Sequence, residues 1–132
     1  MPIVDVHSHY WRYPDHFSDD FRRQAKRAKA GVEMDLTVRF DDYRSLSVPD
    51  VTTIVFGGKA RLSGLWVDDR DIRAYVDANP GQLIGFLSLD PTQDGWEREM
   101  VAGHRELGLR GIKLMPMYAG FRPDDERLDP IY

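Results

Sequence analysis

Two histidines one residue apart close a short apolar stretch near the start of the chain. Residues 3–9 read IVDVHSH, which predicts a buried β-strand that carries polar groups where apolar ones would be expected. Because side chains alternate across a strand, His7 and His9 point the same way, with Cα atoms about 6.6 Å apart, and both can reach one metal ion. Asp5 falls on that face by the same count. The segment predicts a metal site at the carboxyl end of a strand.

A His-x-His pair is weak support by itself, because two histidines around Ser8 could equally begin a solvated turn. Its position favours the metal site, since the pair directly follows an apolar strand. Tyr10 and Trp11 come next and are bulky enough to wall a pocket. Arg12 follows them and offers a cation to a substrate carboxylate, although an arginine in a loop is more often simply solvated.

A lysine in a second apolar strand is the other unusual placement. In residues 110–116, Ile112 and Leu114 fall on one face and Lys113 on the other, so Lys113 points into the interior if the apolar pair packs on helices. Three interpretations remain open. Lys113 could form a buried ion pair with Asp5, contact metal or substrate directly, or have a lowered pKa and take up carbon dioxide as a carbamate ligand.

Composition sets limits on the function. The 132 residues are 42% hydrophobic and 30% charged, which is typical of one soluble globular domain. The net charge of −4 disfavours a nucleic-acid partner. Without cysteine, a metal must be held by His, Asp, Glu or a modified Lys. There is no leader pattern and no run approaching a membrane span, so we expect a cytoplasmic protein without a membrane partner.

The elements that must position these residues alternate between strand and helix. Apolar runs closed by Gly, Asp-Pro or Pro predict strands over residues 3–9, 51–58, 83–90 and 110–116. Helical spacing predicts helices over 18–31, 68–79 and 94–107, the first with Ser18 as its N-cap and a solvated basic face. The first connection, residues 10–50, is a long loop plus a helix. This alternation predicts an α/β fold with parallel strands.

The runs IVDVHSHYW, LIGFLSLDP and GLRGIKLMPMYAGFRPDDERLDPIY resemble the amidohydrolase-related family, the branch that includes aminocarboxymuconate-semialdehyde decarboxylase and related lactonases and hydratases. The resemblance covers essentially the whole chain in the right order. It implies a (β/α)8 TIM barrel in which the first-strand histidines, here His7 and His9, bind a catalytic divalent metal, with zinc the expected ion. No residue of this chain corresponds to the histidines of strands five and six or the aspartate of strand eight that complete the site in this family.

A complete barrel of this type needs about 250 residues, whereas residues 1–132 hold about four βα units. Asp129-Pro130 has the N-cap and N1 pattern of a further helix. We therefore expect a single partial domain over residues 1–132, the N-terminal half of a barrel. Its uncovered strand edges would need the C-terminal half or a second copy of the chain, so we expect a homo-oligomer if a second copy completes it.

Three functions follow from these expectations. The first is metal-dependent hydrolysis of an ester, lactone or amide bond in a small-molecule substrate, once the barrel is complete. The second is non-oxidative decarboxylation of a carboxylated aromatic or muconate-type substrate, with Lys59, Arg61 or Arg122 as further carboxylate binders. The third is a non-catalytic half-barrel that acts as a binding partner, since the sequence assigns no catalytic acid or base. A metal-dependent DNase is disfavoured by the acidic balance.

Overall fold

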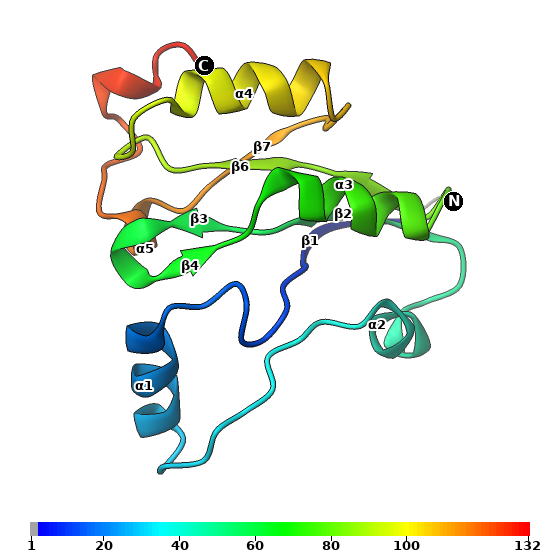
Figure 1. Ribbon diagram of the computed structural model, residues 1–132. Helices are drawn as coiled ribbons and strands as arrows, with labels where there is room; N and C mark the ends of the chain where they lie inside the picture. Colours follow the sequence, from blue (N-terminus) through cyan, green and yellow to red (C-terminus); the bar gives the residue numbers. More distant parts are fainter. Residues whose placement is uncertain (1–2) are drawn as a thin grey trace.

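The computed structural model describes residues 3–132, which form a mixed α/β fold in which strands and helices alternate (Figure 1). The strands are β1 (Ile3–His9), β2 (Val51–Phe56), β3 (Lys59–Ala60), β4 (Leu65–Trp66), β5 (Leu83–Gly85), β6 (Leu87–Leu89) and β7 (Ile112–Leu114). The helices are α1 (Asp19–Ala28), α2 (Phe40–Leu46), α3 (Asp69–Ala78), α4 (Trp96–Arg105) and α5 (Pro116–Ala119), with short 3-10 turns η1 (Arg61–Ser63) and η2 (Glu126–Leu128).

Local sequence signals start the helices that the spacing predicts. The Ser18 hydroxyl accepts a hydrogen bond from the Phe21 N–H at 3.2 Å and caps α1. Asp68 caps α3 in the same way through the Arg70 N–H at 2.8 Å. No residue of α1 is buried, so its basic face is solvated as predicted. The α4 helix is shorter than the predicted range, because Gly95 in the left-handed region (φ 84°) sets its start.

The strands that the sequence predicts pair in parallel and in chain order, which confirms the α/β prediction, whereas β3 and β4 pair antiparallel. The β2 strand lies between β1 and β5, and β6 pairs with β7. The single strand predicted over residues 83–90 is divided at Phe86: its first half pairs with β2 and its second half with β7. The Phe86 N–H donates to the Val55 carbonyl, and the next N–H, of Leu87, donates to Gly111, both at 2.9 Å. One strand thereby links the two small sheets.

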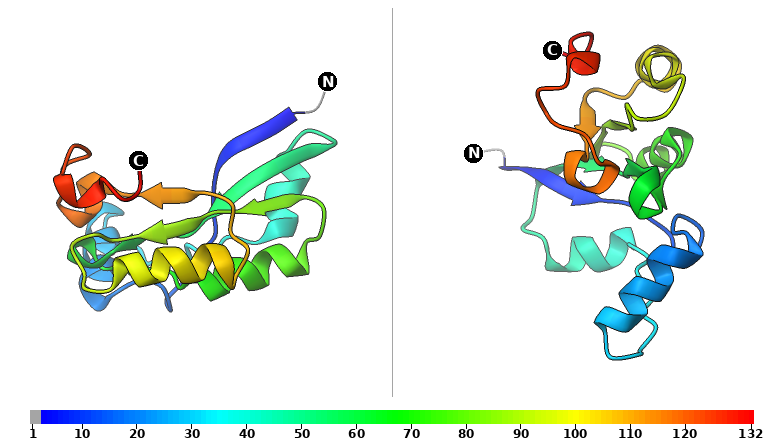
Figure 2. Two further views of the ribbon diagram at one scale, coloured as in Figure 1. Left: turned by 90° about the horizontal axis from the view of Figure 1, so that it is seen from above. Right: turned by 90° about the vertical axis from the view of Figure 1, so that its left-hand side faces the viewer.

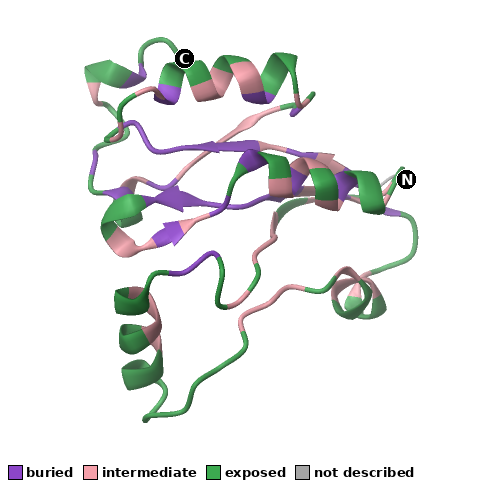
Figure 3. Ribbon diagram, in the orientation of Figure 1, coloured by how far each residue is buried: buried purple, intermediate pink, exposed green. Residues whose placement is uncertain are grey.

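The helices α3 and α4 lie along one side of the strands in both views of Figure 2. A side chain at Gly85 would meet Ile72 and Val76 of α3, and Leu87 packs against Gly103 of α4. The core therefore sits between these helices and the strands, where the burial in Figure 3 is concentrated. We call the face of the strands turned away from α3 and α4 the open face.

Three features differ from the prediction. The β1 strand is not buried: Ile3, Val4 and Val6 are 50%, 50% and 65% exposed, because in the described residues β1 pairs only with β2. The helix α2 lies within the predicted loop; its start, Arg39, makes no side-chain cap, so no capping signal announced it. The third is the hairpin of β3 and β4, whose strands of two residues each are too short to show periodicity.

Candidate metal centre

The rings of His7 and His9 lie together at the end of β1. Their Nε2 atoms are 3.2 Å apart and their ring centroids 5.1 Å apart. Two imidazole nitrogens on one tetrahedral zinc ion, each bonded at about 2.0–2.1 Å, are about 3.3 Å apart. The donor atoms are thus spaced as a shared metal requires. In the absence of an ion, the same distance allows one ring N–H to donate to the other nitrogen, depending on tautomer.

Three neighbours fix the orientation of the His9 ring. Its Nδ1 lies 3.4 Å from the Gly57 carbonyl oxygen, which favours the proton on Nδ1 and leaves Nε2 free to bind a metal. Trp11 stacks on the ring with centroids 4.5 Å apart and planes at 23°, and Phe56 meets it edge to face at 4.8 Å. Burial lowers the pKa of His9, so the neutral ring that metal binding needs is favoured.

Phe56, at the end of β2, lies between the His7 and His9 rings and Lys113. The sequence analysis did not identify Phe56 as part of this site. Its ring is 5.2 Å from that of His7, and the Lys113 Nζ lies 4.5 Å from the Phe56 centroid. Its neighbour Val55 pairs with Gly85 and faces α3, so Phe56 faces the open face. Strand alternation applied to residues 51–56 would have placed Phe56 opposite Val55, but it could not show which strands adjoin. Burial lowers the pKa of Lys113.

The expectation that Asp5 shares the face of the two histidines is wrong. Asp5 pairs with Thr53 and Ser8 with Val55, so β1 has one residue more than β2 over this stretch and the alternation breaks. The Asp5 carboxylate accepts hydrogen bonds from the Tyr43 hydroxyl of α2 at 2.7 Å and from the His7 N–H at 3.0 Å. It faces the helices, and no ion pair joins it to Lys113 among residues 3–132.

The His7 N–H and the Tyr43 hydroxyl lower the pKa of Asp5. The Tyr43 hydroxyl also lies 2.8 Å from the hydroxyl of Thr53, which is buried. Asp5 therefore anchors α2 against β1 and β2, and a role as a residue that touches the substrate has no support in this geometry.

Of the three residues that follow the pair, only Trp11 adjoins it. Tyr10 stacks on Tyr75 of α3 with centroids 4.1 Å apart, which turns it toward the helices. The Arg12 guanidinium lies 3.5 Å from the Asp71 carboxylate of α3. His16 is buried: its Nδ1 accepts from the Arg12 N–H at 2.9 Å, and its Nε2 lies 3.2 Å from Asp71. This network fastens the loop to α3.

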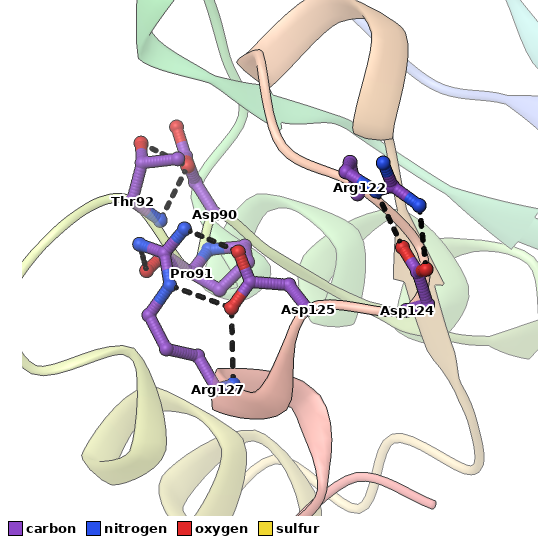
Figure 4. Close-up of polar contacts among 7 residues, drawn as sticks. All are labelled: Asp90, Pro91, Thr92, Arg122, Asp124, Asp125 and Arg127. Carbon is purple, nitrogen blue, oxygen red and sulfur yellow. Dashed lines mark hydrogen bonds and ion pairs between the residues drawn. The ribbon is translucent and has the colours of Figure 1, made fainter.

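The cations expected in loops near the site also have other roles. Lys59 is buried between two carboxylates, those of Asp69 at 2.7 Å and Glu99 at 2.9 Å. Arg61 lies over the Trp66 ring, 3.9 Å from its centroid. Arg122 forms a two-pronged pair with Asp124 on the surface (Figure 4).

The carboxylate of Asp90, after β6, is held by its own turn and by the start of η1. It accepts the N–H groups of Arg61 and Thr92 and the Thr92 hydroxyl, at 2.6–3.0 Å. Nearby, Arg127 pairs with Asp125 and donates to the Pro91 carbonyl, which ties the segment after α5 to this turn (Figure 4). Asp90 is therefore a turn residue and is not available to a metal.

Within residues 3–132, no group of three or more His, Asp or Glu side chains is placed to hold a metal ion. The histidine pair supplies two donors. A cavity of about 550 Å³ lies elsewhere, between the start of α1 and the hairpin of β3 and β4, where Ser18 and Trp66 line it. The pair lies on the open face of the strands.

Fold and site together define an α/β domain of parallel strands that presents two histidines at the end of its first strand. The family model described as amidohydrolase matches residues 4–132, nearly the whole chain. The chain belongs to this family, as the resemblance implied, and this membership supports a hydrolase function. Searches of curated proteins and of solved structures found no match. None of the helices in residues 3–132 has the length and apolarity to cross a membrane.

Proposed function

We propose that this chain is part of a metal-dependent hydrolase that cleaves an ester, lactone or amide bond. The observation that carries the proposal is the 3.2 Å separation of the Nε2 atoms of His7 and His9, which suits two ligands of one divalent ion. Members of this family usually bind divalent metals, and zinc suits the nitrogen donors. Such an ion lowers the pKa of a bound water and polarises a substrate carbonyl.

The chain's own residues prepare this site in distinct ways. The Gly57 carbonyl holds the Nδ1 proton of His9, so that the free Nε2 faces His7. Trp11 and Phe56 restrain the His9 ring from two sides. A ligand held by rigid neighbours loses little freedom when the ion binds, which strengthens binding.

We propose further that residues 1–132 are one half of a (β/α)8 barrel. The parallel strands β1, β2, the divided strand β5–β6 and β7 follow one another in chain order. In the described residues, β1 and β7 each have one free edge. The remaining metal ligands, and the general acid or base, would then come from further polypeptide or from a second copy of the chain. Size-exclusion chromatography of residues 1–132 tests this: a cooperatively folding monomer contradicts it.

Non-oxidative decarboxylation, the reaction of one branch of the family's relatives, is a second candidate. The observation that favours it is Lys113, a cation on the open face next to the pair, which could hold a substrate carboxylate. A non-catalytic half-barrel that only binds a partner is a third candidate. The presence of just two grouped ligands within residues 3–132 favours it.

One experiment separates the three. The protein, loaded with zinc, is assayed against a lactone panel and against a panel of carboxylated aromatics and muconates. Hydrolysis that disappears in His7→Ala and His9→Ala but survives in His104→Ala, an exposed histidine of α4, supports the hydrolase. Release of carbon dioxide with the same dependence supports the decarboxylase. Turnover of neither panel, alone or with a completing chain, supports the binding partner.

A further inference from the structure

The helix α1 buries none of its residues. It lies apart from the strands, together with the segment that follows it, in Figure 1 and in the right-hand view of Figure 2. Its apolar side carries Phe21, Ala25 and Ala28, two of which are too small to fill much space. In the segment that returns past this side, Val32 and Met34 are 61% and 44% exposed. A helix this short is marginal in water unless its apolar side is packed, so this interface is incomplete.

A cavity of about 330 Å³ lies between α1 and the returning segment. Its lining is almost wholly apolar and includes Ala25 and Ala28 of the helix, Met34 and Leu36 of the segment, and Tyr13 from the loop after β1. Sites for small molecules typically enclose about 300–1,000 Å³ and are lined mostly by apolar groups with a few polar ones. Both the volume and the lining of this cavity are of that kind.

Positive charge surrounds the cavity. Arg22, Lys26 and Lys29 also line it. Within residues 3–132, the ion pairs of α1 involve its two arginines and its two aspartates, and neither lysine takes part in one. Glu33, the acidic residue of the lining, accepts a hydrogen bond from the Tyr13 hydroxyl. Two cations without an acid therefore stand beside an apolar space, which suits a ligand with an apolar chain and an anionic end.

We propose that this cavity binds a medium-chain fatty acid, with the alkyl chain between α1 and the returning segment and the carboxylate at Lys26 and Lys29. Burying the alkyl chain removes apolar surface from water. The anion is favoured because residues 19–29 carry five basic and two acidic side chains, in a chain whose net charge is −4. A partner protein fits less well, because a stable protein interface needs about 1,000 Å² or more.

The cavity wall is tied to the loop that carries Trp11. The Val38 N–H donates to the Trp11 carbonyl and the Tyr13 N–H to the Thr37 hydroxyl, both at 3.0 Å. A ligand that binds only the folded arrangement stabilises it by mass action. The bound fatty acid would thus hold α1, the returning segment and this loop together. The inference goes beyond the proposed function and is independent of it, because it involves no metal ion and neither histidine of the pair.

The test uses octanoate and 1-octanol, which share an alkyl chain and differ in charge. Their affinities for the 132-residue protein at neutral pH are measured by NMR titration, below the concentrations at which octanoate forms micelles. We expect octanoate to bind about tenfold more tightly than octanol. The double variant Lys26→Met/Lys29→Met should lose this preference. The matched control is Arg27→Met, which removes a positive charge from α1 at a residue that does not line the cavity.

A second variant tests the cavity itself. Ala28→Leu places a larger apolar side chain in the space, so it should abolish the binding of both probes and leave the thermal midpoint unchanged or higher. The inference is overturned if octanoate does not bind, if Ala28→Leu binds it as tightly as the wild type, or if the double lysine variant keeps the full preference over octanol. A native circular dichroism spectrum of Ala28→Leu shows that lost binding is not lost folding; if that variant does not fold, Ala25→Leu takes its place in the same comparison.

Discussion

Replacing Lys59 by methionine should strongly destabilise the fold, because it removes the cation from a buried ion pair. Lys59 is 4% exposed, and its Nζ lies 2.7 Å from Asp69 and 2.9 Å from Glu99. Burial alone lowers the pKa of Lys59, but the two carboxylates raise it above its usual range, so the side chain is charged. Methionine keeps the length of the side chain and removes the charge.

The expected loss of unfolding free energy in Lys59→Met follows from how deeply its two partners, Asp69 and Glu99, are buried. Asp69 is buried, and its other oxygen accepts the Ser88 N–H at 2.9 Å, so it cannot turn to solvent when the lysine is gone. Leaving one charge of a buried pair uncompensated costs about 3–5 kcal/mol. The side chain of Glu99 is 41% exposed, so its bridge adds at most about 1 kcal/mol. We therefore expect a loss of about 3–5 kcal/mol for Lys59→Met and at most about 1 kcal/mol for Glu99→Gln.

The assay is urea unfolding followed by circular dichroism and tryptophan fluorescence, with the free energy of unfolding compared between variants. Lys59→Met combined with Asp69→Asn should recover part of the loss, because asparagine is uncharged and still offers an oxygen to Ser88. A loss below about 1 kcal/mol for Lys59→Met would refute the reasoning, since it would mean that Asp69 is not held in a dry environment.

Three further predictions follow from particular contacts. Trp11→Ala should weaken zinc binding by about tenfold, and Trp11→Phe by less, because the ring stacked on His9 is lost only in the first; calorimetric titration measures both. Burial raises the pKa of Tyr75 to about 12, so the folded state keeps that proton longer than the unfolded chain does; stability should fall as the pH rises from about 10 to 12, and less so in Tyr75→Phe. Thermal unfolding of the wild type and of Tyr75→Phe at several pH values measures this loss of stability. Gly85→Val should cost about 1–3 kcal/mol, because a Cβ there would lie 2.6 Å from a methyl of Leu109; an unchanged urea midpoint would contradict this.

The order of the fold could be predicted from local signals. The apolar runs, the helical spacing and the cap at Ser18 identified the strands and helices that carry most of the core, because each signal acts within a few residues. The helix α2 and the hairpin of β3 and β4 could not be predicted in this way. They are short, and they are held by partners distant in sequence, as when Tyr43 of α2 binds Asp5 and Thr53.

The candidate site was predictable only in part. Alternation put the rings of His7 and His9 together, and they lie together. The same rule failed for Asp5, because the extra residue in β1 between Asp5 and Ser8 appears only when the strand is aligned with β2. The roles of Phe56 and Lys59 depend on which elements adjoin them, and this information lies in the tertiary structure rather than in the spacing of residues along the chain.

The central claim, that His7 and His9 share one divalent ion, is tested most directly by following the ring nitrogens of all four histidines in an ¹⁵N-labelled sample while zinc is added. The account predicts that the Nε2 signals of His7 and His9 shift together and saturate at one zinc per site, that those of His16 and His104 do not move, and that His7→Ala abolishes the shift at His9. A shift at only one of the two histidines, or no shift at either when zinc is in excess, would contradict it.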